Sequence, residues 1–348
     1  MTDDFLNSLR PGGPGSPVHV VLHHKRGWLA RLWYWLVFLA LIGSIAVNLW
    51  TYRNHRHYFA GLQGPEERYH SGSSRAADKL AIIRISGTIS PPFTSQILAD
   101  IKRAKEDDRV RGVLLAINSP GGLVADSHQI HHRLRELSVE KPIVVSFGSL
   151  AASGGYYVAM GAGPESRIFA EPTTWTGSIG VIIPHYEVVG LAEKLGVEAA
   201  PLKTGEFKDA LSPFRPMTDR DKEVWGNILN QAFEQFVEVI DQGRPKLDAE
   251  QVRALATGQI YTAKDARENG LVDELGYEED ALDALRKKTG LADPKVIEYE
   301  SPSPVWTWLI GLSPRPAASP WPLGWEGGTP RALYLFSAGG SDVGAGRR

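Results

Sequence analysis

An uncharged apolar run from Leu32 to Trp50 constrains this chain more than any other feature of its sequence. As a helix rising ~1.5 Å per residue, the run spans roughly 28 Å, which matches the hydrocarbon core of a bilayer. Trp33 and Trp35 at one end and Trp50 and Tyr52 at the other resemble the aromatic belts that flank membrane spans. The alternatives are a buried helix of a soluble protein and a cleaved signal peptide, but a signal peptide has a shorter apolar stretch and a small-residue cleavage site. The run therefore predicts a retained transmembrane anchor over residues 32–52.

Charge and composition exclude several classes of protein. With 38 Lys and Arg residues against 40 Asp and Glu, the formal net charge of -2 lacks the positive field of a nucleic-acid binder, so nucleic acid is not an expected partner. The absence of cysteine excludes disulfides, thiolate metal sites and a cysteine nucleophile. A weak excess of basic residues before the apolar run favours a cytoplasmic segment 1–31 and a body on the other side of the membrane. These residues are Arg10, Lys25, Arg26 and Arg31 before the run, and Arg53 and Arg56 after it.

Residues 80–300 alternate between predicted strands and helices and form the predicted body. The run Val110–Ile117 is mostly apolar, which is typical of a buried parallel strand, and the repeated βα units predict an α/β fold with a partly parallel sheet. Asp248 and Gln251 resemble a capping box at the start of a further helix. Strands are expected at 80–86, 110–117, 143–147, 168–170 and 180–183, and helices at 95–107, 124–137, from about 154 onward and at 219–242.

The two segments beside the body lack this alternation. Residues 53–79 are largely polar and predict a linker. Residues 301–348 are rich in Pro, Gly and Trp, and their apolar islands 305–312 and 332–336 are too short to cross a bilayer. This tail is expected either to be an irregular extension or to dock onto the body, a neighbouring subunit or the membrane surface.

Two glycine-marked segments at strand-to-helix passages are candidates for chemistry. In Asn118–Gly122, the adjacent Gly121 and Gly122 can expose backbone N–H groups that hold an oxyanion, although a plain turn explains the same pattern. In Ser149–Tyr157, Ser153 is the natural nucleophile because its small neighbours leave the hydroxyl uncovered. The segment is not the G-x-S-x-G elbow, and small residues also allow a helix to pack closely on a sheet.

A serine nucleophile requires a base, and the histidines offer no convincing one. His128 and His132 have the spacing of a zinc pair, but Gln129 replaces the Glu of the H-E-x-x-H motif, so no metal is expected. His185 stands alone after an apolar stretch and is interpreted as structural. The segment 202–209 supplies two lysines, and a lysine can act as general base where burial and hydrogen bonding lower its pKa. The alternative for any single lysine is an ordinary solvated side chain.

Five motifs in matching order resemble the bacterial signal peptide peptidase A (SppA) family of Ser-Lys dyad serine proteases, in its short single-unit form. The motifs are NSPGG, AASGGYY, TGSIG at 176–180, KTGEFKD, and GQIYTAKDARENGLVDELG at 258–276.

The resemblance implies a ClpP/crotonase-like fold over residues 80–300 and bowl-like homo-oligomers in which neighbouring subunits can complete one another's sites. It also implies roles for individual residues. Ser153 corresponds to the nucleophile, Lys208 rather than Lys203 to the general base, Ser178 to a hydroxyl that orients the lysine, and Gly121, Gly122 and Gly154 to the oxyanion-binding amides.

The expected protein is a membrane-anchored serine endopeptidase of the bacterial inner membrane, with its catalytic domain on the extracytoplasmic side and no cofactor. By resemblance, its substrates are remnant signal peptides and other short apolar peptides. Two alternatives remain at this point: an acyl-CoA hydratase or isomerase of the crotonase type, and an inactive membrane scaffold. The first class typically uses Glu or Asp as base and is soluble.

Overall fold

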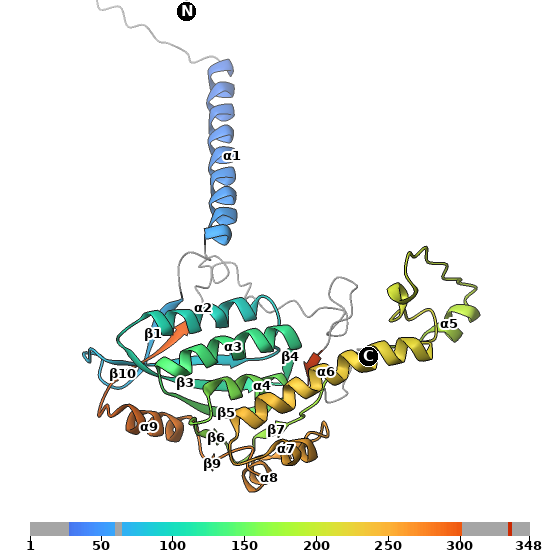
Figure 1. Ribbon diagram of the computed structural model, residues 1–348. Helices are drawn as coiled ribbons and strands as arrows, with labels where there is room; N and C mark the ends of the chain where they lie inside the picture. Colours follow the sequence, from blue (N-terminus) through green and yellow to red (C-terminus); the bar gives the residue numbers. More distant parts are fainter. Residues whose placement is uncertain (1–27, 60–64, 301–332, 336–348) are drawn as a thin grey trace, which may run out of the picture. The chain divides into compact units, whose positions relative to one another are not determined.

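The computed structural model describes residues 28–59, 65–300 and 333–335 and divides the chain into two compact units, Met1–Gln63 and Gly64–Arg348 (Figure 1). In the first unit, helix α1 (Trp28–Phe59) contains the predicted span and extends beyond it at both ends. The stretch Arg31–Leu49 has a mean hydropathy of 1.9 and none of it is buried. Among the residues that the structure describes, α1 alone is long and apolar enough to cross a membrane.

The second unit is built on a nine-stranded mixed sheet whose main path runs β1-β10-β2-β3-β5-β6-β9. Neighbours along this path are parallel except β1 and β10, as the repeated βα units predict. The strands of the sheet are β1 (Glu66–Ser71), β2 (Lys79–Ser86), β3 (Val110–Ser119), β5 (Ile143–Ala152), β6 (Ile168–Ala170), β7 (Trp175–Gly177), β8 (Ile260–Thr262), β9 (Glu274–Leu275) and β10 (Lys295–Glu300).

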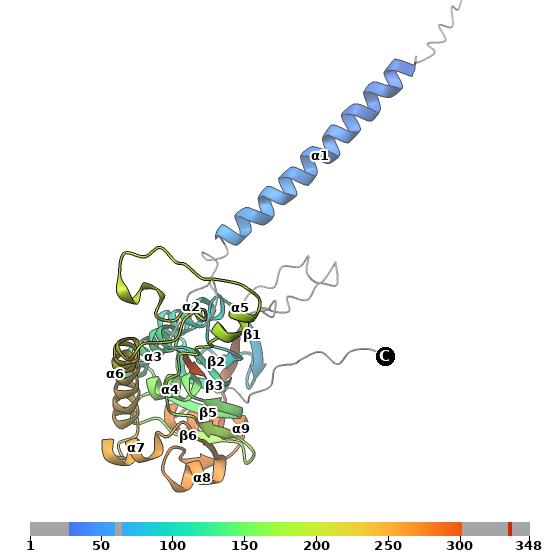
Figure 2. The same cartoon turned by 90° about the vertical axis from the view of Figure 1, so that its right-hand side faces the viewer.

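Helices cover both faces of the sheet, with α2 and α3 on one side and α9 on the other (Figures 1 and 2). Alternate residues of β3 serve the two faces: Val113 and Leu115 join the larger hydrophobic core, and Leu114 joins the smaller one. The helices are α2 (Phe93–Glu106), α3 (Val124–Glu140), α4 (Gly154–Ala159), α5 (Val189–Lys194), α6 (Asp219–Gly243), α7 (Ala249–Leu255), α8 (Ala263–Glu268) and α9 (Glu278–Thr289), with 3-10 turns η2 (Met160–Ala162) and η3 (Glu206–Asp209).

A separate two-stranded sheet joins β4 (Gly121–Leu123) to β11 (Leu333–Leu335). Of the tail's two apolar islands, only this part of 332–336 is described, and it docks onto the body; the island 305–312 lies outside the described residues. The predicted capping box is confirmed, because Gln251 N donates to Asp248 Oδ1 at 2.8 Å.

Two predictions differ from the structure. The strand expected at 180–183 is wrong: Ile182 is 52% exposed and makes only an isolated bridge to Leu333, because the chain leaves the sheet there. The linker expected at 53–79 contains the end of α1 and all of β1. The strand β1 escaped detection because it is a polar edge strand, held to β10 by backbone pairing and by Arg68 with Glu298 at 3.0 Å.

Candidate active site

The turn between β3 and α3 brings two backbones too close for any side chain. A Cβ placed on Gly121 would lie 2.0 Å from the carbonyl oxygen of Tyr334 and 2.5 Å from the amide nitrogen of Gly154. A Cβ on Gly122 would lie 2.0 Å from the carbonyl oxygen of Ile89. Gly121 also has a φ of +95°, a conformation that favours glycine. The two glycines of the NSPGG motif are therefore required by close backbone approach.

Ser153 lies at the next strand-to-helix passage, directly between β5 and α4. Its φ of 54° and ψ of -117° are unusual for a residue with a side chain, and it is only 1% exposed. Its amide donates to Gly177 O at 2.8 Å, which helps to fix the strained turn. Because α4 begins at Gly154, the amide of Gly154 is among the first-turn donors that have no partner within the helix.

Ser178 comes directly after Gly177, whose carbonyl accepts the hydrogen bond from the Ser153 amide. It has a φ of 49°, is 8% exposed, and its amide donates to Gln259 O at 2.7 Å. Ser153 and Ser178 are the two non-glycine residues with positive φ in the described part of the chain, and Gly177 connects them. The structure therefore brings the backbone segments of both predicted hydroxyl residues side by side, through the hydrogen bond from Ser153 N to Gly177 O.

The amides of the two neighbouring glycines point in different directions. Gly121 N donates to Ser119 Oγ at 3.1 Å, so this N–H group already has a partner. Ile89 N donates to Gly121 O at 2.8 Å, and Leu123 N donates to Ile89 O at 2.9 Å. Since backbone groups alternate along a strand, the N–H and carbonyl of Gly122 face the opposite side, toward β11.

Lys208 lies in η3, within residues 188–215, which form a projecting segment beyond the N-terminal end of α6 (Figure 1). Its side chain is exposed, and no hydrogen bond or ion pair joins it to Ser153 within the described residues of one chain. Lys203 behaves differently, because its Nζ lies 2.8 Å from Asp209 Oδ1 and 3.2 Å from Glu206 O. Within one chain, the structure therefore does not bring the predicted base to the predicted nucleophile.

The projecting segment is tied to α6 by a buried ion pair. Arg215 Nη1 donates to Asp221 Oδ2 at 2.7 Å, and Asp221 is 1% exposed. The Arg215 hydrogen bond, with further hydrogen bonds from Thr218, holds the pKa of the Asp221 carboxyl well below its usual range. Thr218 and Asp221 also form the capping box that opens α6. The end of the segment that follows Lys208 is thus fixed to the body.

Two of the three histidines of α3, His128 and His132, have local polar partners. His128 Nδ1 lies 2.8 Å from Tyr157 Oη, and His132 Nε2 lies 3.4 Å from Glu136 Oε1. Burial lowers the pKa of His131 to about 4, with a further contribution from His128. No group of three or more potential metal ligands occurs among the described residues.

Comparison with known proteins identifies the family. The model of peptidase family S49 matches residues 135–292. A protein of Enterococcus faecium named for the signal peptide peptidase SppA is 39% identical over 256 residues, which cover 70% of this chain and 73% of the relative. The chain belongs to peptidase family S49.

Further similarities define the class of this S49 peptidase. A Synechocystis protein described as a protease is 38% identical over 67% of this chain and 83% of its own length. The chloroplastic serine protease SPPA of Arabidopsis thaliana is 29% identical over 67% of this chain and 36% of its own length. A Clp protease model matches residues 66–176. These similarities confirm the predictions of a serine-type peptidase and of a ClpP-like α/β fold. They favour a peptidase over the alternative of an acyl-CoA hydratase or isomerase.

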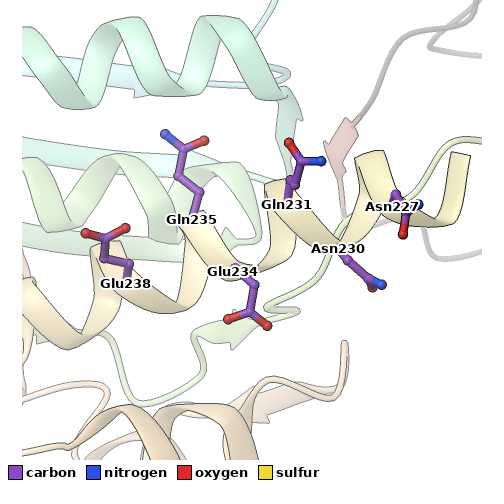
Figure 3. Close-up of a pocket in the computed structure, with 6 residues that line it drawn as sticks. All are labelled: Asn227, Asn230, Gln231, Glu234, Gln235 and Glu238. Atoms are coloured by element: carbon purple, nitrogen blue, oxygen red, sulfur yellow. The ribbon is translucent and has the colours of Figure 1, made fainter. Parts of the chain in front are cut away.

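An aromatic cluster beside the candidate site escaped the sequence analysis. Tyr334 of β11 is fully buried, with its ring centroid 5.0 Å from that of Tyr157 and 4.6 Å from that of Phe236. The available signal was the apolar island at 332–336, for which the sequence left both an irregular extension and docking open. A polar surface hollow also follows α6, and its six lining side chains all come from that one helix (Figure 3). None of the six belongs to the glycine-marked segments.

Proposed function

We propose that this S49 peptidase is a membrane-anchored endopeptidase that hydrolyses short apolar peptides, including remnant signal peptides, through an acyl-enzyme on Ser153. One observation carries the proposal: Ser153 sits in a strained, buried turn next to the close approach of Gly121 and Gly154. Such a turn presents a hydroxyl beside backbone N–H groups, which is the requirement for attack on a carbonyl.

In the proposed mechanism, Lys208 is the general base. Its neutral amine takes the proton of Ser153 as Oγ bonds to the carbonyl carbon of the substrate, and Ser178 orients the amine. The oxyanion accepts hydrogen bonds from the amides of Gly122 and Gly154, while Gly121 allows the backbones to approach. The lysine ammonium then protonates the departing amine, and water repeats the cycle on the ester.

The exposure of Lys208 supports a site completed by a second subunit. The projecting segment that carries it also exposes apolar side chains, among them Leu191 at 58%, Leu195 at 69% and Leu202 at 103%. Apolar side chains gathered on a projecting segment favour contact with another protein surface. We therefore place Lys208 of one subunit at Ser153 of its neighbour in a homo-oligomer.

The proposed location follows from α1. Its apolar side chains between Leu32 and Leu49 are exposed, and a bilayer would cover them. We propose that residues 32–52 anchor the chain in the bacterial inner membrane, with residues 1–31 in the cytoplasm and the peptidase domain 80–300 on the extracytoplasmic side. In that arrangement, the active site faces the compartment where cleaved signal peptides remain in the membrane.

The test measures hydrolysis of an apolar peptide by the full chain in detergent micelles. Ser153→Ala and Lys208→Ala are each expected to lower kcat by about 10³-fold or more, because each removes a member of a unit that acts together. Lys203→Ala is the matched control and is expected to retain activity within about threefold. Full activity in either the Ser153 or the Lys208 variant would contradict the dyad. An inactive scaffold would hydrolyse nothing, even without substitution.

A further inference from the structure

A buried hydroxyl in the first turn of α3 takes no part in the hydrogen bonding of the fold. It belongs to Ser127, whose side chain is fully buried. A serine within a helix often donates to the carbonyl four residues earlier, but Ser127 Oγ makes no hydrogen bond within the described residues. A buried polar group without a partner destabilises the fold, so its presence calls for a functional explanation.

The Ser127 hydroxyl lies against the backbone that follows the proposed nucleophile. A Cβ placed on Gly154 would lie 2.6 Å from Ser127 Oγ and 3.1 Å from Gly121 Cα. The helices α3 and α4 pack side by side, so the first turn of α3 meets Gly154, the first residue of α4 (Figure 1). The absence of a side chain at Gly154 leaves room for the hydroxyl, which therefore borders the close approach of the two glycines.

Other buried hydroxyls beside the candidate site already have partners. Ser119 Oγ donates to Gly87 O at 2.6 Å and accepts from Gly121 N at 3.1 Å. Thr176 Oγ1 donates to Ala151 O at 2.6 Å. These two side chains brace the strands that lead into the site. Ser127 differs from them because its donor is not used within the described part of the chain.

We infer that Ser127 is a further catalytic residue, whose hydroxyl donates a hydrogen bond to the oxyanion beside the amide of Gly154. The inference rests on the proposed function of Ser153. The substrate oxygen becomes negatively charged only when Ser153 Oγ bonds to the carbonyl carbon, and a charged acceptor binds a hydroxyl donor more strongly than a neutral one. The hydrogen bond therefore lowers the barrier to reaction more than it strengthens the binding of the intact peptide.

Kinetics and urea unfolding of Ser127→Ala in the full chain test this role together. We expect kcat for an apolar peptide to fall by about ten- to 100-fold and KM to change by less than about threefold, because the lost contact belongs to the transition state. The variant should unfold at an equal or higher urea concentration, because the substitution removes a buried hydroxyl that has no partner. An unchanged kcat, or a fall in kcat accompanied by a lower unfolding midpoint, would overturn the inference.

Tyr299→Phe is the matched control. Tyr299 Oη is also buried without a partner among the described residues, but it belongs to β10, which β2 separates from β3. The control is expected to keep kcat within about threefold of the unsubstituted chain and to show an equal or higher unfolding midpoint. A loss of kcat as large as that of Ser127→Ala would mean that the position of the hydroxyl does not matter, which would overturn the inference.

A peptide aldehyde gives a readout that a purely structural serine would not change. Ser153 Oγ bonds to the aldehyde carbon, its proton passes to Lys208, and the aldehyde oxygen becomes an oxyanion in the proposed site. We expect the inhibition constant of the aldehyde to rise by about ten- to 100-fold in Ser127→Ala, as for a transition-state analogue. The matching peptide alcohol cannot bond to Ser153 and should bind both proteins equally. Equal inhibition of both proteins by the aldehyde would contradict the proposed hydrogen bond.

Ser153→Ala separates this inference from the proposed function. Hydrolysis that is lost in Ser153→Ala but fully retained in Ser127→Ala overturns the role of Ser127 and leaves the proposed function standing. Hydrolysis that is fully retained in Ser153→Ala overturns both.

Discussion

The two members of the proposed catalytic pair lie in contrasting surroundings. Ser153 is buried between β5 and α4, with its backbone held by Gly177. Lys208 lies in a short 3-10 turn, exposed, on a segment that ion pairs fasten to α6. One chain therefore holds Ser153 in a fixed turn but leaves Lys208 in solvent. Under the proposed function, rigid packing sets the position of the serine, whereas assembly with a neighbouring subunit would set that of the lysine.

The largest effect on activity is expected from a substitution beside Ser153, which tests whether rigid packing sets the position of the proposed nucleophile. In Gly154→Ala, the new Cβ would lie 2.6 Å from Ser127 Oγ and 3.0 Å from Tyr334 O, so the backbone at the proposed oxyanion donor has to shift. We expect kcat for an apolar peptide to fall by about 10²- to 10³-fold. Gly190→Ala is the matched control on the projecting segment, where a Cβ meets nothing within 4 Å. Comparable losses in the two variants would remove the distinction between the regions.

Co-expression of two inactive variants tests whether the lysine is supplied by a neighbouring subunit. If Lys208 acts on the Ser153 of a neighbour, a mixture of Ser153→Ala and Lys208→Ala subunits contains some sites with both groups intact. At equal amounts we expect about a quarter of the original activity, since each site draws its two residues from independent subunits. Kinetics of the purified mixed oligomer give the measurement. No recovery would mean that each chain uses its own lysine.

A smaller effect is expected where the projecting segment meets the body. Asp221→Asn weakens the ion pair with Arg215 and is expected to lower kcat/KM by about tenfold, because the lysine loses its fixed position. The melting temperature should fall as well, because the Asp221 carboxylate is buried and accepts hydrogen bonds from Arg215 and Thr218. Asp219→Asn is the control, since Asp219 lies in the same turn of α6 with its side chain fully exposed. A large loss of stability with unchanged kinetics would assign Asp221 to folding alone.

The smallest effect is expected on the stability of the body and leaves its activity unchanged. Burial raises the pKa of Asp100 to about 7, and its Oδ1 has no hydrogen-bond partner. Because the folded pKa lies above the unfolded value, the stabilisation is complete below about pH 3.8 and is lost as the pH rises toward 7. Asp100→Asn should therefore increase the free energy of unfolding on the order of 2 kcal/mol at pH 8 and change it little at pH 4.

Urea unfolding of the two proteins at both pH values gives that measurement, with the exposed Asp108→Asn as control. Peptidase kinetics should be unaffected, because the body keeps its fold at both pH values. A stability gain of equal size at pH 4 would show that the charge of Asp100 is not its cause.

The sequence predicts the elements whose signal is local. The apolar run of β3 and the small residues around Ser153 each specify a buried strand or a tight turn through neighbouring residues. The strand β1 was not predicted, since an edge strand with both faces polar has no hydropathy pattern. The strand β11 was not predicted because its position depends on pairing with β4, which is distant in the chain. Under the proposed function, the surroundings of Lys208 likewise depend on a neighbouring subunit.

The insertion of β11 between β4 and Ile182 has a kinetic consequence. Residues 333–335 belong to the same chain as β4, so they compete with any external peptide that pairs with this edge of β4. An external peptide has to displace β11 to bind there, and its apparent KM is raised by the free energy needed to do so.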